Sequence, residues 1–216
     1  MNRTHRLLAI TAGAAATVLV GCATLPSPAE LDTQTTAMHK ADFRAQGIAG
    51  VDRLDQDLGQ RACSSDQPPA PAIAKQIETE SLAAVKWPSD GKYIGNWRDG
   101  ERLAQNGRGM TWSDAKAEPT ANGGMCYNCH QIGPAEISFG NIGPSLHQYG
   151  KIRGVKDPAA PASAEIVKYT WGKLWNSKAY SACSNMPRFG HAKLLDEDQI
   201  RHLMALLLDP KSPVNQ

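Results

Sequence analysis

The sequence Cys-Tyr-Asn-Cys-His at residues 126–130 constrains this chain more than any other feature. Two thiols stand three positions apart, and an imidazole follows the second thiol directly. On one helical turn, each thiol can form a thioether to one vinyl group of a haem, and the imidazole can bind the iron. The motif therefore predicts one covalently bound haem c, attached through Cys126 and Cys129, with His130 as the proximal ligand.

Two other kinds of site use paired cysteines. A structural zinc site normally needs four ligands, and the sequence contains no second Cys-x-x-Cys pair. A thioredoxin-like dithiol would follow a strand in a mixed chain, and no segment here shows sustained strand alternation. Haem attachment is the preferred interpretation, with zinc binding and dithiol chemistry as the alternatives.

The amino terminus has the pattern of an export signal. Arg3 and Arg6 precede a mostly apolar run at residues 7–20, which is short for a membrane span of roughly 20 residues. The run ends in Leu-Val-Gly-Cys, which resembles the bacterial lipobox and makes Cys22 the expected lipid anchor. Cleavage after Ala23 without lipid is the alternative. Both interpretations predict a periplasmic protein, and the first predicts attachment to the membrane.

The charge balance argues against a nucleic-acid partner. The chain has 23 Lys and Arg against 21 Asp and Glu. Removal of residues 1–21 takes away Arg3 and Arg6 but no acid, so the exported chain is formally neutral. A neutral chain lacks the basic excess that attracts phosphate backbones.

The cysteine count predicts a disulfide. Five cysteines are present, and three are assigned to the haem and the lipid anchor. Cys63 and Cys183 remain, and in an oxidising compartment a bond between them is the simplest interpretation. Two buried free thiols, or a bond from Cys63 to another chain, are the alternatives.

Helix signals predict an all-α fold. Asp196 with Gln199 three residues later is typical of a capped helix start, and Ile200, Leu203, Met204 and Leu207 then form one apolar stripe. Ser163 is expected to cap the amino-terminal end of a helix that runs to Trp175. The expected helices cover residues 72–86, 96–107, 163–175 and 196–208, with one or two short helices in residues 31–60 and loops in residues 110–162.

Met186 is the expected second axial ligand of the iron. It lies in a Met-Pro loop before the last helix, where mono-haem cytochromes place the thioether. His191 is the alternative, whereas Met204 falls on the apolar stripe and is better explained as core. Candidate partners of the haem propionates are Tyr149, Arg153, Trp171 and Arg188.

The Gly143-Pro144 step is expected to lie against the proximal histidine. In c-type cytochromes a proline at this distance after the motif brings a backbone carbonyl to the Nδ1 of that ring. An ordinary Gly-Pro turn is the alternative.

Four segments together resemble the SoxX family, the small mono-haem subunit of the SoxAX sulfur-oxidation cytochrome. They are residues 125–131, 142–150, 183–190 and 208–215, of which Met-Pro-Arg-Phe-Gly and Ser-Pro-Val-Asn are the most specific parts. The resemblance covers roughly residues 96–216. It implies a cytochrome c-like haem domain at 96–216. With the export signal taken as a signal peptide at residues 1–21, residues 22–95 remain as an amino-terminal extension that is expected to be helical or irregular.

The resemblance also implies a function. The family acts in an L-cysteine S-thiosulfotransferase complex, which joins thiosulfate to a cysteine of the carrier protein SoxYZ and releases two electrons. The catalytic cysteine belongs to the SoxA partner, so this chain would hold no catalytic residue and would pass electrons from its haem to a further cytochrome. The alternative is a free-standing periplasmic electron carrier. A haem enzyme acting alone, such as a peroxidase, would need an open iron position.

Overall fold

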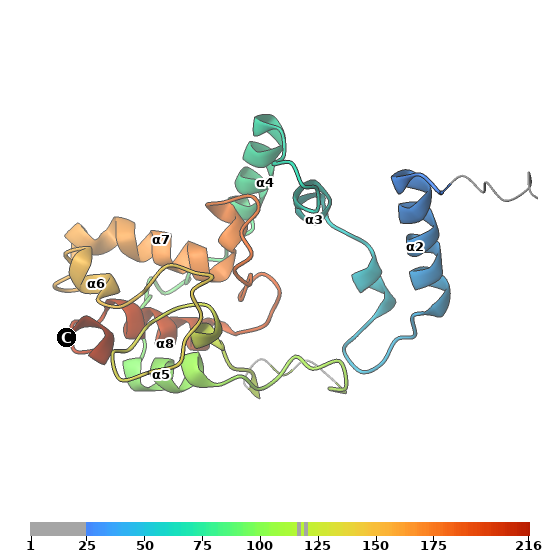
Figure 1. The fold of residues 1–216 in the computed structure, drawn as a ribbon. Coiled ribbons are helices and arrows are strands. Elements are labelled where there is room, and N and C mark those ends of the chain that lie inside the picture. Colours follow the sequence, from blue (N-terminus) through green and yellow to red (C-terminus); the bar gives the residue numbers. More distant parts are fainter. Residues whose placement is uncertain (1–24, 116–117, 119–120) are drawn as a thin grey trace, which may run out of the picture. The chain divides into compact units, whose positions relative to one another are not determined.

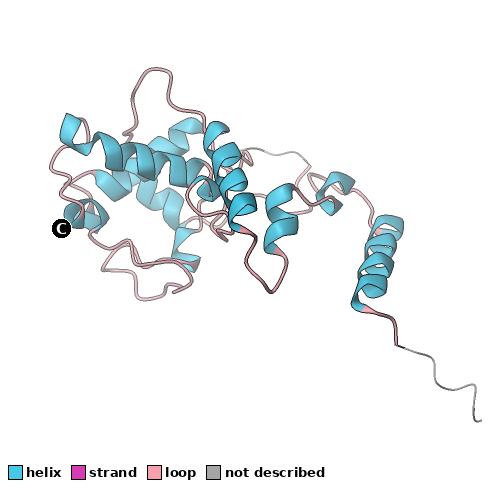
Figure 2. Cartoon of the chain, turned by 90° about the horizontal axis from the view of Figure 1, so that it is seen from above, coloured by secondary structure: helices cyan, strands magenta, loops and turns pink. Residues whose placement is uncertain are grey.

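The computed structural model describes residues 25–115, 118 and 121–216. Over these residues the chain is helical, as Figures 1 and 2 show, and its extended pairing is limited to a single bridge between Gln46 and Ala49. The predicted all-α class is confirmed. The α-helices are α2 (Pro28–Asp42), α3 (Leu58–Cys63), α4 (Pro71–Ala83), α5 (Trp97–Gln105), α6 (Tyr149–Ile152), α7 (Ala164–Trp175) and α8 (Glu197–Leu208). The short 3-10 helices are η1 (Val51–Leu54), η3 (Cys126–Asn128), η4 (Pro161–Ser163), η5 (Ser177–Ala179) and η6 (Pro213–Asn215).

The chain divides into two compact units, Met1–Arg44 and Ala45–Gln216. In the first unit, α2 starts at a capping box between Ser27 and Glu30 and buries none of its residues. The predicted signal peptide and Cys22 lie outside the described residues. None of the described helices combines the length and the apolar character needed to cross a membrane.

The second unit includes residues 45–95, which the sequence assigned to the extension. Val85 is buried in the main core, and Tyr93 packs edge-on against Trp171 of α7, with ring centroids 5.4 Å apart. Because these apolar side chains fill the same core as α7, they belong to one compact unit with residues 96–216.

The expected disulfide joins Cys63 at the end of α3 to Cys183. The two cysteines are 120 residues apart in sequence and their Cα atoms are 5.4 Å apart. Closing a loop of that length stabilises the fold by about 4–5 kcal/mol in the chain-entropy model. The bond ties α3 to the segment that follows η5.

The last helix starts and packs as its sequence predicted. Asp196 accepts a hydrogen bond from the backbone N–H of Gln199, and the Gln199 side chain accepts one from the backbone N–H of Asp196, which completes a capping box. The stripe of α8 is buried, and α5 packs against α8 (Figure 1). At Gly100 of α5 an added Cβ would overlap the carbonyl oxygen of His202, so the approach of the two backbones needs glycine there.

Ser163 does not cap α7, contrary to expectation. Its backbone is in the αR region, and its side chain makes no capping bond. The hydroxyl instead donates to the carbonyl oxygen of Asp157 over 2.7 Å and closes the preceding loop. A side-chain cap normally needs an extended backbone at this position, and the 3-10 turn η4 prevents that.

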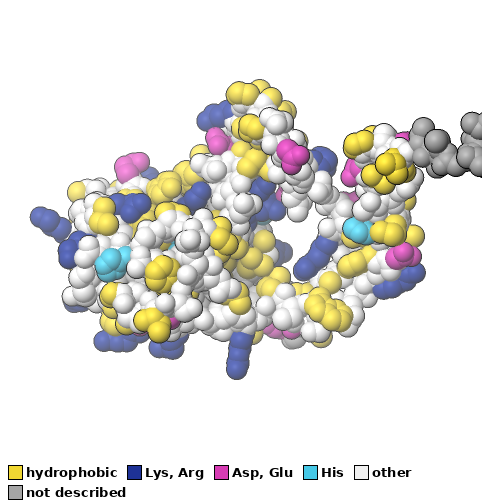
Figure 3. All heavy atoms as spheres, viewed as in Figure 1, with side chains coloured by type: hydrophobic (Ala, Val, Ile, Leu, Met, Phe, Trp, Pro, Cys, Tyr) yellow, Lys and Arg dark blue, Asp and Glu magenta, His cyan; other side chains and the backbone are white. Residues whose placement is uncertain are grey.

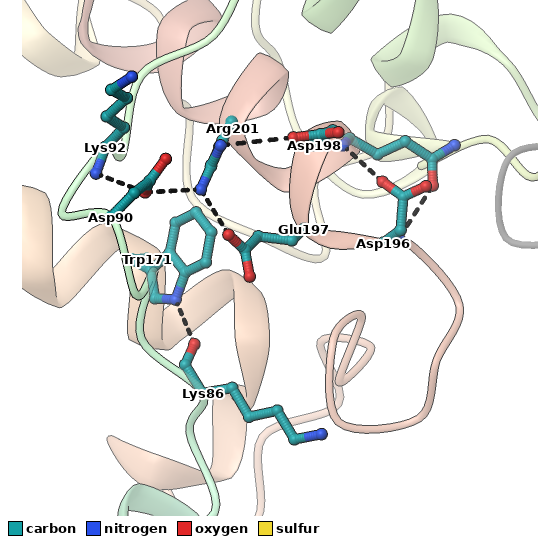
Figure 4. A network of polar contacts seen from close by, with 9 residues as sticks. Lys86, Asp90, Lys92, Trp171, Asp196, Glu197, Asp198 and Arg201 are labelled. Carbon is teal, nitrogen blue, oxygen red and sulfur yellow. Dashed lines mark hydrogen bonds and ion pairs between the residues drawn. The ribbon is translucent and has the colours of Figure 1, made fainter.

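A polar network joins α8 to the segment before α5 (Figure 4). The guanidinium of Arg201 pairs with Asp90 at 2.8 Å and with Glu197 at 2.5 Å, while its side chain is only 18% exposed. The Arg201 carbonyl also accepts the backbone N–H of Gly95 over 2.9 Å. Residues 90–96 therefore contact α8 at both ends of the segment, since the Asn96 N–H also donates to His202 Nδ1 over 3.0 Å.

The side chain of Asn215 in the carboxyl-terminal tail forms hydrogen bonds to both α6 and the end of α8. The Asn215 Oδ1 accepts the backbone N–H groups of Gly150 and Lys151 in α6, at 2.8 and 3.1 Å. Its Nδ2 donates to the carbonyls of Leu207 and Asp209 at the end of α8, at 3.1 and 3.0 Å. The Ser-Pro-Val-Asn tail thus satisfies helix-end groups that would otherwise lack partners.

We predict that Gly100→Ala lowers the free energy of unfolding by about 1–3 kcal/mol, because the methyl group forces α5 away from α8. Chemical denaturation measures this loss. Arg102→Ala is the matched control on the same helix, since its side chain is 73% exposed and its ion pair with Asp99 contributes little. Equal effects of the two substitutions would contradict close packing at Gly100.

Candidate functional site

The end of α5 anchors the segment that leads into the motif. Gly124 donates its backbone N–H to the carbonyl of Leu103 over 2.8 Å, and Met125 donates to the carbonyl of Asn106 over 3.1 Å. A Cβ at Gly123 would overlap that Asn106 carbonyl. The glycine pair therefore lets the chain pass close to the helix end, and α5 sets the position of the motif.

The motif itself forms a 3-10 turn, η3. The carbonyl of Cys126 accepts the backbone N–H groups of Cys129 and His130, at 3.1 and 2.9 Å. Both cysteines are free thiols and partly buried. Burial raises the pKa of the Cys126 thiol to about 12, so this thiol is neutral at physiological pH.

The ring of His130 is held by the chain that follows the motif. Its Nδ1 lies 2.7 Å from the carbonyl oxygen of Pro144. A carbonyl only accepts, so Nδ1 is the donor and carries a proton, and the tautomer that this contact selects in the neutral ring has its lone pair on Nε2. Gly143 lies against the ring so closely that a Cβ there would overlap it. The predicted carbonyl contact is present, and Pro144 itself supplies it.

A loop of residues 140–146 runs along the motif and fixes this contact. Its glycines matter, because a Cβ at Gly140 would overlap the carbonyl of Asn128. The backbone hydrogen bonds between the two segments are Gly140 N–H to Tyr127 O at 2.8 Å, Gly143 N–H to Cys129 O at 2.8 Å and Leu146 N–H to Gln131 O at 2.7 Å. The loop is irregular, but its register against the motif is defined.

Apolar side chains are exposed on and beside this loop. Ile137 is 95% exposed, Ile142 78% and Phe139 43%, and Glu136 is the one charged residue in residues 131–146. Other apolar side chains also reach the surface, as one face of the molecule shows in Figure 3. No role was expected for Ile137 or Phe139, and Ile142 was noted only as part of the segment 142–150; large apolar residues in a stretch rich in Gly and Pro were the available signal.

The segment of residues 182–191, here called the Met186 loop, is tethered to the core. The Met186 side chain is partly buried and packs against the core cluster that Cys126 also contacts. Its carbonyl accepts the hydroxyl of Ser177 over 2.6 Å, and its backbone N–H donates to the hydroxyl of Ser184 over 3.3 Å. Met204, in contrast, is wholly buried in α8, as expected of a core residue.

His191, the alternative iron ligand, lines a pocket beside α4. It borders a pocket of about 180 Å³ together with Ile77 of α4 and Lys178 of η5. Burial and the neighbouring Arg188 lower the pKa of the imidazole. The neutral ring can still bind a metal, but it faces a pocket next to α4.

The candidate partners of the haem propionates already have protein partners. The hydroxyl of Tyr149 is bonded to Thr170 at 2.9 Å. The other three are Arg153, stacked 3.7 Å from the Tyr149 ring centroid, Trp171, bonded to the Lys86 carbonyl at 2.8 Å, and Arg188, paired with Asp57 at 3.0 Å.

Within the described part of the chain, the Nδ1 of His147 is a buried atom that lacks a hydrogen-bond partner.

No group of three or more His, Cys, Asp or Glu side chains among the described residues is arranged to hold a metal ion. A haem iron takes only its axial ligands from the protein, so a haem site does not require such a group.

No protein-family model matches the sequence. A protein of Aquifex aeolicus described as an uncharacterized lipoprotein is 38% identical over 167 residues, which cover 74% of this chain and 73% of that protein. Identity at this level over most of both chains reflects common descent. The chain belongs to the same family as this lipoprotein.

Proposed function

We propose that this chain is a mono-haem c-type cytochrome that transfers electrons, with one haem c bound covalently to Cys126 and Cys129. The hydrogen bond from His130 Nδ1 to the Pro144 carbonyl carries the proposal. It fixes the ring and leaves Nε2 free to bind iron, as a proximal ligand requires. A bound haem would supply a one-electron iron couple.

The residues around the motif suit covalent attachment. Cys126 and Cys129 are free although the chain forms a disulfide elsewhere. Gly143 allows the backbone to lie flat against the His130 ring.

Met186 is the proposed second axial ligand. Its side chain packs against the same core cluster as Cys126, whereas His191 lines the pocket beside α4. A thioether ligand would also close the iron to external substrates, which suits an electron carrier better than a peroxidase.

The finer proposal is that the chain is the electron-transfer subunit of a SoxAX-type complex, and it rests on the sequence resemblance. The reaction joins a carrier thiol to thiosulfate, forms one sulfur–sulfur bond and releases one proton and two electrons. A single bound haem would carry one electron at a time, so two transfers through this chain would complete each turnover. The nucleophile is proposed to belong to a SoxA-like cytochrome, the thiol to a SoxYZ-like carrier, and the electron acceptor to be a further cytochrome c.

The apolar residues beside the motif are the proposed docking surface for the SoxA-like partner. Ile137, Phe139 and Ile142 are exposed in the nearly uncharged segment that follows the motif. Such a surface suits a stable complex, because burying it removes apolar area from water at little electrostatic cost.

The lipoprotein relative supports lipidation of Cys22. The Leu-Val-Gly-Cys sequence provides the modification site, and the lipid would hold the chain at a membrane surface outside the cytoplasm. The same tether favours the alternative function, a free-standing electron carrier confined to the membrane where redox proteins exchange electrons.

We predict that the protein, produced with a cytochrome c maturation system, carries one haem that survives denaturation, and that Cys126→Ala with Cys129→Ala abolishes its attachment. The ferric protein should show the weak long-wavelength band of a methionine–iron bond. Met186→Ala should remove that band and Met204→Ala should leave it. Loss of the band in Met204→Ala alone would contradict the ligand assignment.

We predict that Gly143→Ala displaces the His130 ring and weakens its bond to the Pro144 carbonyl. A carbonyl acceptor raises the basicity of a ligating imidazole, so the midpoint potential should rise in the variant while the haem stays attached. Asn141→Ala is the control, since it is exposed on the same loop. An unchanged potential in Gly143→Ala would contradict the role of this contact.

We predict that the chain co-purifies with a larger haem protein from sulfur-grown cells, and that Ile142→Asp breaks this association without loss of haem. The purified chain alone should accept electrons but not conjugate thiosulfate to a carrier cysteine. Conjugation by the chain alone would refute the division of roles. Migration as a monomer in those extracts would favour the free-standing carrier.

A further inference from the structure

The segment that precedes the expected haem domain makes three contacts with the Met186 loop. Cys63 of α3 is bonded to Cys183. The carboxylate of Asp57, at the start of α3, pairs with the guanidinium of Arg188 at 3.0 Å. The carboxylate of Glu78 in α4 accepts the backbone N–H of Ala182 over 3.3 Å.

These contacts lie on both sides of Met186. Cys183 is three residues before it and Arg188 two residues after it. The Met186 loop contains no helix. From within its own half of the chain, Met186 is held by hydrogen bonds to the Ser177 and Ser184 hydroxyls and by packing of its side chain against the core. Tethers this close in sequence leave the intervening backbone little room to move, because few rotatable bonds separate them.

Asp57 joins the two parts in a specific way. Its Oδ1 accepts the backbone N–H of Gln60 over 2.7 Å and so caps α3, while its Oδ2 pairs with Arg188. The Arg188 side chain is 25% exposed. One carboxylate thus fixes the start of α3 and the chain just after Met186.

We propose that residues 57–83 brace the Met186 loop, and that Asp57 and the Cys63–Cys183 disulfide are positioning residues that hold the Met186 thioether at the sixth iron position. This inference rests on the proposed function. It gives the amino-terminal extension a role in the redox site, although none of its side chains is proposed to touch the haem.

A brace of this kind controls how often the loop opens. An external ligand binds the iron only when the thioether has left, so its apparent affinity is proportional to the open fraction. Weakening the brace should therefore tighten the binding of added imidazole to the ferric protein, under conditions where the chain remains folded.

The test titrates imidazole into the ferric haem-loaded protein and compares Asp57→Asn with Asp90→Asn. Asparagine keeps an oxygen for the Gln60 N–H at one site and for the Lys92 N–H at the other, so each substitution removes the charge and keeps the backbone hydrogen bond. At Asp57 the oxygen that pairs with Arg188 becomes an amide nitrogen, whereas at Asp90 the oxygen that accepts the Lys92 N–H also accepts from Arg201. Both acids pair with an arginine, but Asp90 pairs with Arg201 of α8 and not with the Met186 loop. The two variants therefore form a matched pair.

We expect the imidazole dissociation constant to fall about twofold to threefold in Asp57→Asn, the scale of a partly exposed ion pair, and to stay unchanged in Asp90→Asn. Replacing both Cys63 and Cys183 by Ala should lower it by about tenfold or more, since a long covalent constraint is lost. Added salt should shift the wild-type constant toward that of Asp57→Asn and leave Asp57→Asn unmoved.

Each outcome is decisive. A wild-type ferric protein without the methionine–iron band would show that the proposed ligation fails, separately from the brace. With the band present, unchanged imidazole binding in Asp57→Asn would overturn the brace, and so would equal shifts in Asp57→Asn and Asp90→Asn. If the cysteine variant does not fold, the comparison of the two aspartate variants decides alone.

Discussion

The close packing of α5 on α8 is the contact on which the rest of the structure depends. Gly100 allows the two backbones to come into contact. The ends of both helices then hold other segments in place. The end of α5 provides the carbonyls that anchor the segment before the motif. The end of α8 is clamped to α6 by Asn215. Burial of the apolar α8 stripe lowers the free energy of the folded state. This gain offsets the conformational entropy that the long loops lose when they become ordered.

The two sides of the candidate site are held by different means. The end of α5 places the motif, and the His130 ring is then oriented by residues within about fifteen positions of it, through the Pro144 carbonyl and the backbone bonds of the 140–146 loop. Met186 is positioned by groups far away in sequence, including Cys63 and Asp57. If the iron is bound as proposed, the orientation of the histidine ligand depends on contacts near it in sequence, whereas the position of the methionine ligand depends on contacts with distant segments.

The side chains of Arg188 and Trp171 show that sequence position alone does not reveal which partner a polar group has in the folded chain. Arg188 lies beside Met186 and was a natural candidate for a haem carboxylate, but it is paired with Asp57. Trp171 was another, and its indole N–H is bonded to the Lys86 carbonyl. In both cases the competing partner comes from residues 45–95, the segment assigned by sequence to an extension.

Patterns contained in a short stretch were readable from the sequence alone: the Cys-x-x-Cys-His motif, the Asp196–Gln199 capping box, the α8 stripe and the all-α class. Each depends on neighbours a few residues apart, whose geometry the local backbone dictates. The pairing of Cys63 with Cys183 followed from counting, because only one pair remained. Tertiary structure alone decided that the compact unit begins at Ala45 and that the Ser163 hydroxyl closes a loop instead of capping α7. It also decided that α3 and α4 hold the Met186 loop, because those outcomes depend on which distant groups the folded chain brings within bonding distance.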